Sequence, residues 1–570
     1  MSRKLVIIGG VAGGATAAAR ARRLDEDAEI IMIERGEYVS FANCGLPYHI
    51  GGEIRKRARL LVQTRHGLAR RFALDIRTRQ EAIRIDPAAR LVHIRDLETG
   101  REYAETYDNL LLSPGAAPFV PPVPGNDHPR VLTLRNMADM DRIKKFVDRE
   151  AKSALVIGGG FIGLEMAENL RRRELAVSLV ELAPQVMPPL DAEIAARLHR
   201  ELQTHGIELH LNDAVTRFDD DGGSVRAQLK SGRTLQADLA IMAVGVRPDT
   251  ALARTAGLAV DERGALLVDD HLRTSDPHIY AVGDAIQVQD VVSGTPAFVP
   301  LAGPANRQAR IAVDNIFGRV SRYRGTQGTS IVQLFDVTAA LTGASEKTLR
   351  RLDLPYRKVY VFRGHHVGYY PGAEEMMIKL LFTPEEGRVL GAQIIGGAGV
   401  DKRIDVLAVA VQAGLTVADL EEMELAYAPQ FGAAKDPVNI AGFVARNALS
   451  GDEDYVFAEE LGPEAAERFT IIDVRDPVEY AAGTIPGARL LPLSELRERW
   501  REIPNGKPVL TFCTVGQRAY YANRMLRQKG LQVRNLAGGF NTYNLVRAAQ
   551  TSSVPPAETP PPCSVAPGEA

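Results

Sequence analysis

A strand–glycine loop–helix–strand unit that ends in an acidic residue occurs twice in this 570-residue chain. The first copy has an apolar run at residues 4–8, a glycine-rich loop at 9–14, a helical stretch to about Leu24 and a strand that ends in Glu34. Glycines at such a turn let the backbone approach a pyrophosphate, which binds at the N-terminus of the following helix. This arrangement predicts a parallel α/β sheet that holds a dinucleotide.

The second copy follows the same order. A strand at 153–157 leads into the loop 158–163, a helix to about Arg173 and a strand at 176–180 that ends in Glu181. Two copies predict two bound dinucleotides. The residues predicted to contact them are Gly9, Gly10, Gly14 and Glu34 in the first unit, and Gly158, Gly160, Gly163 and Glu181 in the second.

Two observations refine the prediction of two dinucleotide sites. Val11 stands where the first loop would have its second glycine. Glu181 would repel a 2′-phosphate and no arginine follows it, which favours NADH and leaves NADPH open.

Further strand-like runs at 110–113, 239–244 and 278–282 end near glycines, and the last run precedes Gly283 and Asp284. A carboxylate at a strand end can hold a ribityl or ribose hydroxyl, so Asp284 is a candidate FAD ligand.

Cys44 and Cys513 are far apart in the chain, and neither has a second cysteine at CxxC spacing. Each is therefore interpreted as a single redox or sulfur-carrying thiol, which suggests two sulfur-handling sites. Cys44 lies at a predicted helix start, where the pKa of a thiol can be lowered toward thiolate. A lone thiol forms a mixed disulfide with a small thiol, or a sulfenic acid with peroxide. Cys563, in a Pro-rich tail, is interpreted as incidental.

Composition excludes several classes of protein. Lys and Arg (69) nearly balance Asp and Glu (71), which gives no indication of nucleic acid or membrane binding. The apolar run at 5–10 is too short to span a bilayer, and no secretory signal pattern is present. Three cysteines cannot form a disulfide framework in a chain of this length, which favours a reducing, cytoplasmic location. No metal site is predicted.

The order of these motifs resembles the flavin disulfide-reductase superfamily. Ser-Phe-Ala-Asn-Cys-Gly-Leu-Pro-Tyr at 40–48, Tyr-Tyr-Pro-Gly at 369–372 and the segments 426–429 and 434–439 are similar to those of coenzyme A disulfide reductases, and also to related NADH oxidases and peroxidases. The resemblance covers about residues 1–445. It implies FAD, NADH and a homodimer that completes each active site.

The resemblance also implies roles for individual residues. Cys44 would be the catalytic thiol, and Tyr427 with Tyr369 (or Tyr370) would supply hydroxyls from the partner subunit. Gly283, Asp284 and Ala302 would contact FAD. Arg20 and Arg23 lie three apart on a helix and suit the phosphates of coenzyme A. The residues that would line the coenzyme A site are Thr16, Arg20, Arg23, Ser40, Asn43, Asn306 and Lys435.

Residues 463–548 resemble a rhodanese domain. The motif Ile-Ile-Asp-Val-Arg at 471–475, the strand at 508–512 and the glycines at 538–539 support this. The short loop from Cys513 to Arg518 can direct successive N–H groups at a sulfur anion, with a helix N-terminus behind it. Such a cradle suits a cysteine persulfide. Arg518 would either fix the loop or attract an anionic sulfur donor.

The predicted fold is therefore α/β, with two Rossmann-like nucleotide-binding domains, an α+β dimerisation domain and a C-terminal rhodanese-like α/β domain. The expected boundaries are 1–115 with 250–325 for FAD, 116–249 for NAD, 326–450 for dimerisation, 463–548 for rhodanese, and a disordered tail at 549–570. The predicted function is NAD(P)H-dependent reduction of coenzyme A disulfide, coenzyme A persulfide or polysulfide. Three alternatives stay open: an NADH oxidase or peroxidase that uses a Cys44 sulfenic acid, a sulfurtransferase or sulfur carrier, and a redox-sensing binding protein.

Overall fold

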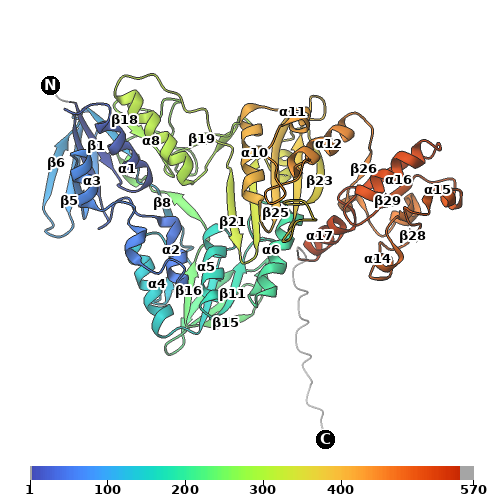
Figure 1. Ribbon diagram of the computed structural model, residues 1–570. Helices are drawn as coiled ribbons and strands as arrows, with labels where there is room; N and C mark the ends of the chain where they lie inside the picture. Colours follow the sequence, from blue (N-terminus) through green and yellow to red (C-terminus); the bar gives the residue numbers. More distant parts are fainter. Residues whose placement is uncertain (1–2, 553–570) are drawn as a thin grey trace, which may run out of the picture.

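The computed structural model describes residues 3–552 and contains two five-stranded parallel sheets in its first half (Figure 1). Their glycine loops lie at the carboxyl ends of β1 and β10. The first sheet has the order β18-β7-β1-β2-β3, with bounds Ile279–Ala281, Asn109–Leu112, Lys4–Ile8, Glu29–Glu34 and Asp75–Thr78. The second has the order β12-β11-β10-β16-β9, with bounds Glu208–Leu211, Ala176–Glu181, Ser153–Ile157, Leu239–Met242 and Val131–Leu132.

Helices cover these sheets and bring distant segments together. Helix α1 (Ala12–Arg22) packs along α8 (Ala302–Ile316), and α2 (Leu46–Gly51), which follows Cys44, packs on α5 (Phe161–Arg172). The first sheet thus takes strand β18 and helix α8 from a part of the chain beyond the second sheet. Such interleaving is expected where one α/β unit is inserted into another.

Smaller elements complete the first half of the chain. The helices α3, α4, α6 and α7 span Arg65–Phe72, Met137–Arg149, Ala192–Thr204 and Ala251–Thr255. Two three-stranded antiparallel sheets are formed by β4, β5 and β6 (Gln80–Asp86, Leu91–Asp96, Glu102–Thr106) and by β13, β14 and β15 (Val215–Asp220, Val225–Leu229, Thr234–Ala237). Two short antiparallel pairs join β8 (Ala116–Pro118) to β17 (Val246–Pro248) and β19 (Val288–Gln289) to β20 (Pro296–Ala297).

The next unit is an antiparallel sheet covered by helices. Its strand order is β21-β22-β25-β24-β23, with bounds Ser330–Leu334, Val337–Gly343, Val389–Gly396, Glu375–Phe382 and Arg357–Gly364. The helices are α9 (Glu346–Arg351), α10 (Val400–Ala413), α11 (Val417–Glu422) and α12 (Pro437–Leu449). Strands β24 and β25 are almost entirely apolar and buried, and α10 and α12 pack against this sheet.

The last unit is a parallel sheet with the order β26-β30-β29-β27-β28, at Tyr455–Val456, Val533–Leu536, Val509–Phe512, Thr470–Asp473 and Arg489–Leu490. Its helices are α13 (Ala465–Arg468), α14 (Pro477–Ala481), α15 (Leu496–Arg499), α16 (Gln517–Arg527) and α17 (Gly539–Ser552). Strand β26 lies upstream of the expected boundary at 463. Helix α17 extends into the expected tail, and residues 553–570, which include Cys563, lie outside the described part.

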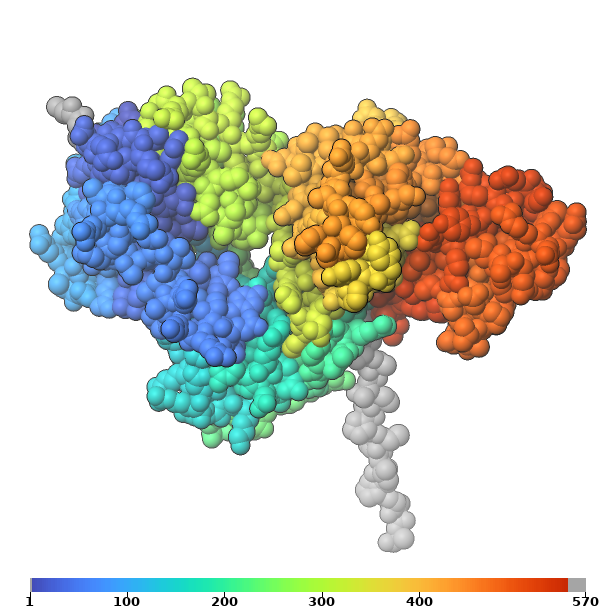
Figure 2. Space-filling view, viewed as in Figure 1, coloured from blue at the N-terminus to red at the C-terminus, as the bar shows by residue number. Residues whose placement is uncertain are grey.

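Contacts between units are extensive (Figure 2). Helix α17 packs on α6, so the C-terminal unit touches the second nucleotide-binding unit. The side chain of Lys379 is fully buried and lies 2.9 Å from Asp191, 2.5 Å from Glu193 and 2.6 Å from Glu346. Burial alone would lower the pKa of Lys379, but the surrounding carboxylates raise it well above its usual value. This ion cluster therefore joins α6 to the antiparallel sheet. Within residues 3–552, no helix is long and apolar enough to cross a membrane.

Candidate active sites

Both glycine loops have the same hydrogen bonding. Glu34 Oε2 accepts from Gly10 N at 2.8 Å, and Glu181 Oε2 accepts from Gly159 N at 2.6 Å. The second oxygen of each carboxylate accepts from a backbone N–H two residues later, at 2.7 Å in both cases. Each acidic side chain is thus fixed beside its loop, in position for a ribose.

The loop conformations require glycine at specific positions. Gly9 and Gly158 have φ values of +96° and +105°. A Cβ on Gly14 would lie 1.8 Å from the Gly9 carbonyl oxygen, and a Cβ on Gly163 would lie 1.9 Å from that of Gly158. Gly160 faces open space, since a Cβ there would meet no atom within 4 Å. The loops therefore fit pyrophosphates at the starts of α1 and α5.

Gly283 and Asp284 lie just after β18, beside the first loop. Gly283 N donates to Gln308 Oε1 at 2.8 Å, which ties this turn to α8, whose first residue is Ala302. Burial raises the pKa of Asp284 to about 6. A half-buried carboxyl with this shift suits a hydroxyl-bearing ligand that would replace its lost hydration.

Cys44 lies in a single helical turn (Asn43–Gly45) that leads into α2, and its side chain is exposed. Surrounding protein partly desolvates the thiol, and this raises its pKa; the nearby Glu165 and Asp284 raise it further. The expected lowering of this pKa is therefore wrong for the protein chain alone. Burial, together with the two acidic groups, outweighs any effect of so short a helix in lowering the thiol pKa.

The sequence analysis missed two titratable residues near Cys44. Tyr48 Oη donates to Glu165 Oε1 at 3.3 Å, which joins α2 to α5. Burial raises the pKa of Glu165 to about 7, so this carboxyl can gain or lose a proton near neutrality. Tyr48 belongs to the Cys44 motif and could have been singled out, whereas Glu165 appears in sequence as an ordinary helix residue.

The residues expected to line a coenzyme A site are only partly brought together. Thr16 Oγ1 donates to Asn306 Oδ1 at 2.5 Å, so α1 and α8 meet at this point. Ser40 N donates to the Gly10 carbonyl at 2.8 Å, and Ser40 adopts a φ of +47°. Asn43 and Lys435 are exposed.

The two expected arginines differ from each other. Arg20 is buried and forms an ion pair with Asp314 of α8, with N–O distances of 2.6 and 2.8 Å. The carboxylate of Asp314 thus neutralises Arg20, and a role for Arg20 at a coenzyme A site stays a prediction. Arg23 is exposed and lies 5.8 Å from the ring centre of Phe72.

Tyr369 and Tyr427 form a pair, with 3.0 Å between their hydroxyl oxygens. The hydrogen bond with Tyr427 raises the pKa of Tyr369, so its phenol stays protonated at neutral pH. Beneath the pair, buried Arg403 donates to the His365 carbonyl at 2.7 Å and to Asp436 at 2.8 Å. This arginine holds together the two loops that present the tyrosines.

Cys513 lies in the turn between β29 and α16. Its sulfur accepts from Gly516 N at 3.2 Å, and its side chain is 1% exposed. Gly516 adopts a φ of +93°, which a residue with a Cβ would rarely take. This N–H and the following 11-residue helix provide the predicted cradle for a sulfur anion.

Arg518 fixes the Cys513 loop. Its guanidinium donates to both Glu479 oxygens at 2.7 Å and to Thr514 Oγ1 at 3.0 Å. The hydrogen bonds from Arg518 lower the pKa of Glu479 to about 2. Of the two roles considered for Arg518, this geometry favours fixing the loop over attracting a donor.

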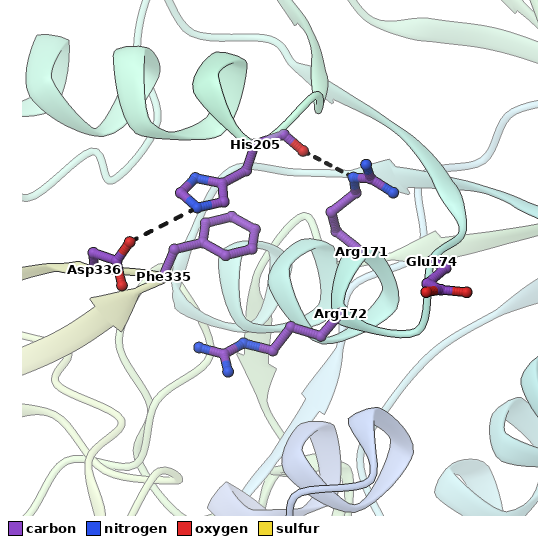
Figure 3. Close-up of a pocket in the computed structure, with 6 residues that line it drawn as sticks. All are labelled: Arg171, Arg172, Glu174, His205, Phe335 and Asp336. Carbon is purple, nitrogen blue, oxygen red and sulfur yellow. Dashed lines mark hydrogen bonds and ion pairs between the residues drawn. The ribbon is translucent and has the colours of Figure 1, made fainter.

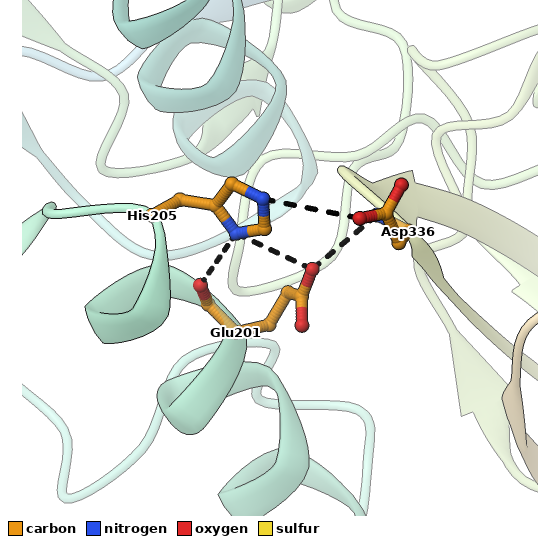
Figure 4. A group of neighbouring side chains, drawn as sticks. All are labelled: Glu201, His205 and Asp336. Atoms are coloured by element: carbon orange, nitrogen blue, oxygen red, sulfur yellow. Dashed lines mark hydrogen bonds and ion pairs between the residues drawn. The ribbon is translucent and has the colours of Figure 1, made fainter.

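A separate cavity of about 410 Å³ lies at the end of α5 and α6 (Figure 3). The rings of His205 and Phe335 stack at 3.8 Å within it. His205, Glu201 and Asp336 bring metal-ligand atoms within 4.8 Å of one another (Figure 4). Glu201 already accepts from Asp336 N at 3.3 Å and from His205 Nδ1 through its carbonyl at 3.1 Å. These contacts attach the β21–β22 hairpin to α6, and no predicted site residue lines this cavity.

Comparison with known proteins defines the class. Residues 3–305 match the pyridine nucleotide-disulphide oxidoreductase model, residues 329–436 the dimerisation domain of that family and residues 458–545 the rhodanese-like domain. The chain belongs to the pyridine nucleotide-disulphide oxidoreductase family. It is an FAD- and pyridine nucleotide-dependent oxidoreductase with a C-terminal rhodanese domain, as the sequence predicts.

Three individual proteins are similar to this chain over most of their length. A coenzyme A disulfide reductase of Staphylococcus haemolyticus is 37% identical over 447 residues, which cover 78% of this chain and 100% of that protein. The reduced Bacillus anthracis CoADR-RHD crystal structure has a TM-score of 0.94 and 50% identity, covering 96% of this chain and 98% of that one. A NAD-dependent persulfide reductase from A. fulgidus has a TM-score of 0.89 and 36% identity, covering 95% and 100%.

Proposed function

We propose that this protein uses NADH to reduce coenzyme A persulfide or coenzyme A disulfide at Cys44, and that Cys513 exchanges sulfane sulfur with coenzyme A. The observation that carries the proposal is the pair of isolated thiols in different settings. Cys44 is exposed and lies near Glu165 and Asp284, whereas Cys513 is buried and its sulfur accepts from the Gly516 N–H. The names of the relatives support the choice of coenzyme A compounds.

Each expected domain has its own role in the proposed function. Residues 1–115 and 250–325 would hold FAD, residues 116–249 the nicotinamide dinucleotide, and residues 326–450 would form the dimer. The homodimer is proposed because the matched dimerisation domain presents Tyr369 and Tyr427 on exposed loops. A reducing cytoplasm is the proposed compartment, since it keeps both thiols free.

At the reductase site, the Cys44 thiolate would attack the coenzyme A sulfur of the substrate, which is the sulfur bonded to the pantetheine carbon. The substrate S–S bond breaks, hydrosulfide or coenzyme A thiolate leaves, and a Cys44–coenzyme A mixed disulfide remains. The hydroxyls of Tyr369 and Tyr427 of the partner subunit would donate to the leaving thiolate. FAD, when bound, would supply the electron pair from NADH that reduces the mixed disulfide and frees Cys44. Thr16 and Asn306 would orient the coenzyme A moiety, with Arg23, Ser40, Asn43 and Lys435 around it.

At the rhodanese site, the Gly516 N–H and the start of α16 would stabilise a Cys513 persulfide. The outer sulfur would pass to coenzyme A thiolate, which forms coenzyme A persulfide and frees Cys513. The product of this transfer is the proposed substrate at Cys44. The long pantetheine arm of coenzyme A would connect the two sites.

The test is anaerobic NADH oxidation by the purified flavoprotein, with coenzyme A persulfide or coenzyme A disulfide as acceptor and with sulfide counted. We expect turnover with the persulfide, one sulfide per NADH, and loss of turnover in Cys44→Ala. Turnover on the disulfide alone would restrict the activity to a coenzyme A disulfide reductase. Slow turnover on both, with rapid NADH loss in oxygen, would instead support an oxidase.

A further inference from the structure

Glu453 is a buried carboxyl to which the proposed mechanism gives no role. It lies just before β26, and its side chain and those of Asn523 and Asn535 are each at most 2% exposed. Glu453 Oε1 accepts from Asn523 Nδ2 at 2.9 Å. Among residues 3–552, Glu453 Oε2 has no hydrogen-bond partner, and neither has Asn535 Oδ1.

The orientation of Asn535 is fixed by the Cys513 loop. Asn535 Nδ2 donates to the Gly516 carbonyl at 3.1 Å, so exchanging its amide oxygen and nitrogen would set two acceptors against each other. Its Oδ1 therefore points away from the loop, and the Asn535 side chain lies within hydrogen-bonding reach of the Glu453 carboxyl. Two buried acceptors without a donor are costly, and a proton on the carboxyl supplies that donor.

A second set of hydrogen bonds connects Glu453 to the Cys513 loop. Asn523 Oδ1 accepts from Thr511 Oγ1 at 2.6 Å, and Thr511 lies on β29, two residues before Cys513. The carboxyl thus contacts residues that hold both ends of the sulfur loop. Gly516, which Asn535 holds by its carbonyl, donates its N–H to the Cys513 sulfur.

The cationic side chains near Glu453 form ion pairs with other carboxylates. Arg524 and Arg527 of α16 are the cations that act on it, but they pair with Asp452 at 2.9 Å and Asp454 at 2.6 Å. Tyr455 of β26 is a further titratable neighbour of Glu453, and burial raises the pKa of that phenol. Burial likewise raises the pKa of Glu453 to about 7, against an ordinary value of 4.5.

We propose that Glu453 is a positioning residue for the Cys513 loop, which in its protonated form donates to Asn535 Oδ1 and so holds the Gly516 N–H on the sulfur. Ionisation replaces the donor with an acceptor, and the loop loses its fixed geometry. The rhodanese half-site is thereby active with protonated Glu453 and weakened when pH rises above neutrality. This inference rests on the proposed sulfur-carrying role of Cys513.

The test compares full-length wild-type protein with Glu453→Gln, Glu453→Ala and the exposed control Glu467→Gln between pH 6 and 9. Thiosulfate is the sulfur donor and cyanide the acceptor. The sulfane sulfur passes to Cys513 with release of sulfite, and then to cyanide as thiocyanate. We expect the ratio of the Glu453→Gln rate to the wild-type rate to be near one at pH 6 and to rise severalfold by pH 9. A ratio that is constant with pH would overturn the proposal.

Two readouts independent of sulfur transfer separate this inference from the proposed function. Amide hydrogen exchange at Gly516 should be fast in Glu453→Ala and slow in Glu453→Gln. The Tm advantage of Glu453→Gln over wild type should grow as pH rises from about 4.5 to 7 and then level off, because the folded state alone keeps the proton in that window. If wild type transfers no more sulfur than Cys513→Ala, the function of Cys513 fails, and these two readouts still decide the role of Glu453.

Discussion

Arg363 Nη1 donates to Gln517 Oε1 at 2.9 Å, which joins the end of β23 to the first residue of α16, within the Cys513 loop. The same strand leads within six residues to Tyr369. Close packing supports this junction, since a Cβ on Gly538 would lie 2.9 Å from Tyr360 Cβ. The rhodanese loop is therefore docked on the domain that presents the tyrosine pair.

Arg363→Ala should loosen this docking. A hydrogen bond from a charged donor contributes about 1.5–3 kcal/mol, so amide exchange in residues 513–518 should accelerate by about tenfold or more. Hydrogen–deuterium exchange measured by mass spectrometry tests this, with the exposed Arg388→Ala as the matched control. Equal exchange in both variants would show that the contact does not restrain the loop.

Lys379→Met should destabilise the protein strongly, because it leaves the buried carboxylates of Asp191 and Glu193 without their cation. Removing one partner of a buried ion pair typically costs about 3–5 kcal/mol. Urea unfolding followed by circular dichroism should show this loss, and the exposed Lys145→Met should change little. A decrease in the free energy of unfolding of less than about 1 kcal/mol would mean that water or a rearrangement compensates for the missing cation.

Glu165→Gln should lower the pKa of the Cys44 thiol, because it removes an anion that raises that pKa. The rate of Cys44 alkylation in the reduced protein, measured against pH, reports the thiolate fraction. Its midpoint should shift to lower pH in Glu165→Gln and stay unchanged in the exposed Glu174→Gln. An unchanged midpoint in both variants would remove Glu165 from the Cys44 environment.

Arg518→Ala should slow sulfur transfer at Cys513, and Arg518→Lys should restore little of it, because lysine cannot hold both Glu479 oxygens. The low pKa of Glu479 depends on this pair, so its stabilising effect should be present above about pH 4.5 and be lost toward pH 2. Because the pair is partly exposed, that effect is at most about 1 kcal/mol. Acid unfolding curves of wild type and Arg518→Ala that coincide would contradict this.

The sequence predicted the features that depend on local pattern. Both glycine loops with Glu34 and Glu181, and the cradle at Cys513, follow from residues that are close in the chain. Placement that depends on distant partners was not predictable. Arg20 is neutralised by Asp314, 294 residues away, and Lys379 acquires its carboxylates from two domains. Residues 451–462 fall between two expected domains, but β26 within them pairs with β30, which only the assembled sheet reveals.

The most direct test of the account identifies what Cys44 carries. The protein with Cys44 as a free thiol, incubated anaerobically with coenzyme A disulfide and digested without reductant, should yield a Cys44 peptide with the mass of a coenzyme A mixed disulfide. Anaerobic NADH should remove that mass, and Cys513→Ala should retain both steps. A Cys44 peptide found only as a sulfenic acid, or unmodified while the protein still turns over, would contradict the mixed-disulfide mechanism.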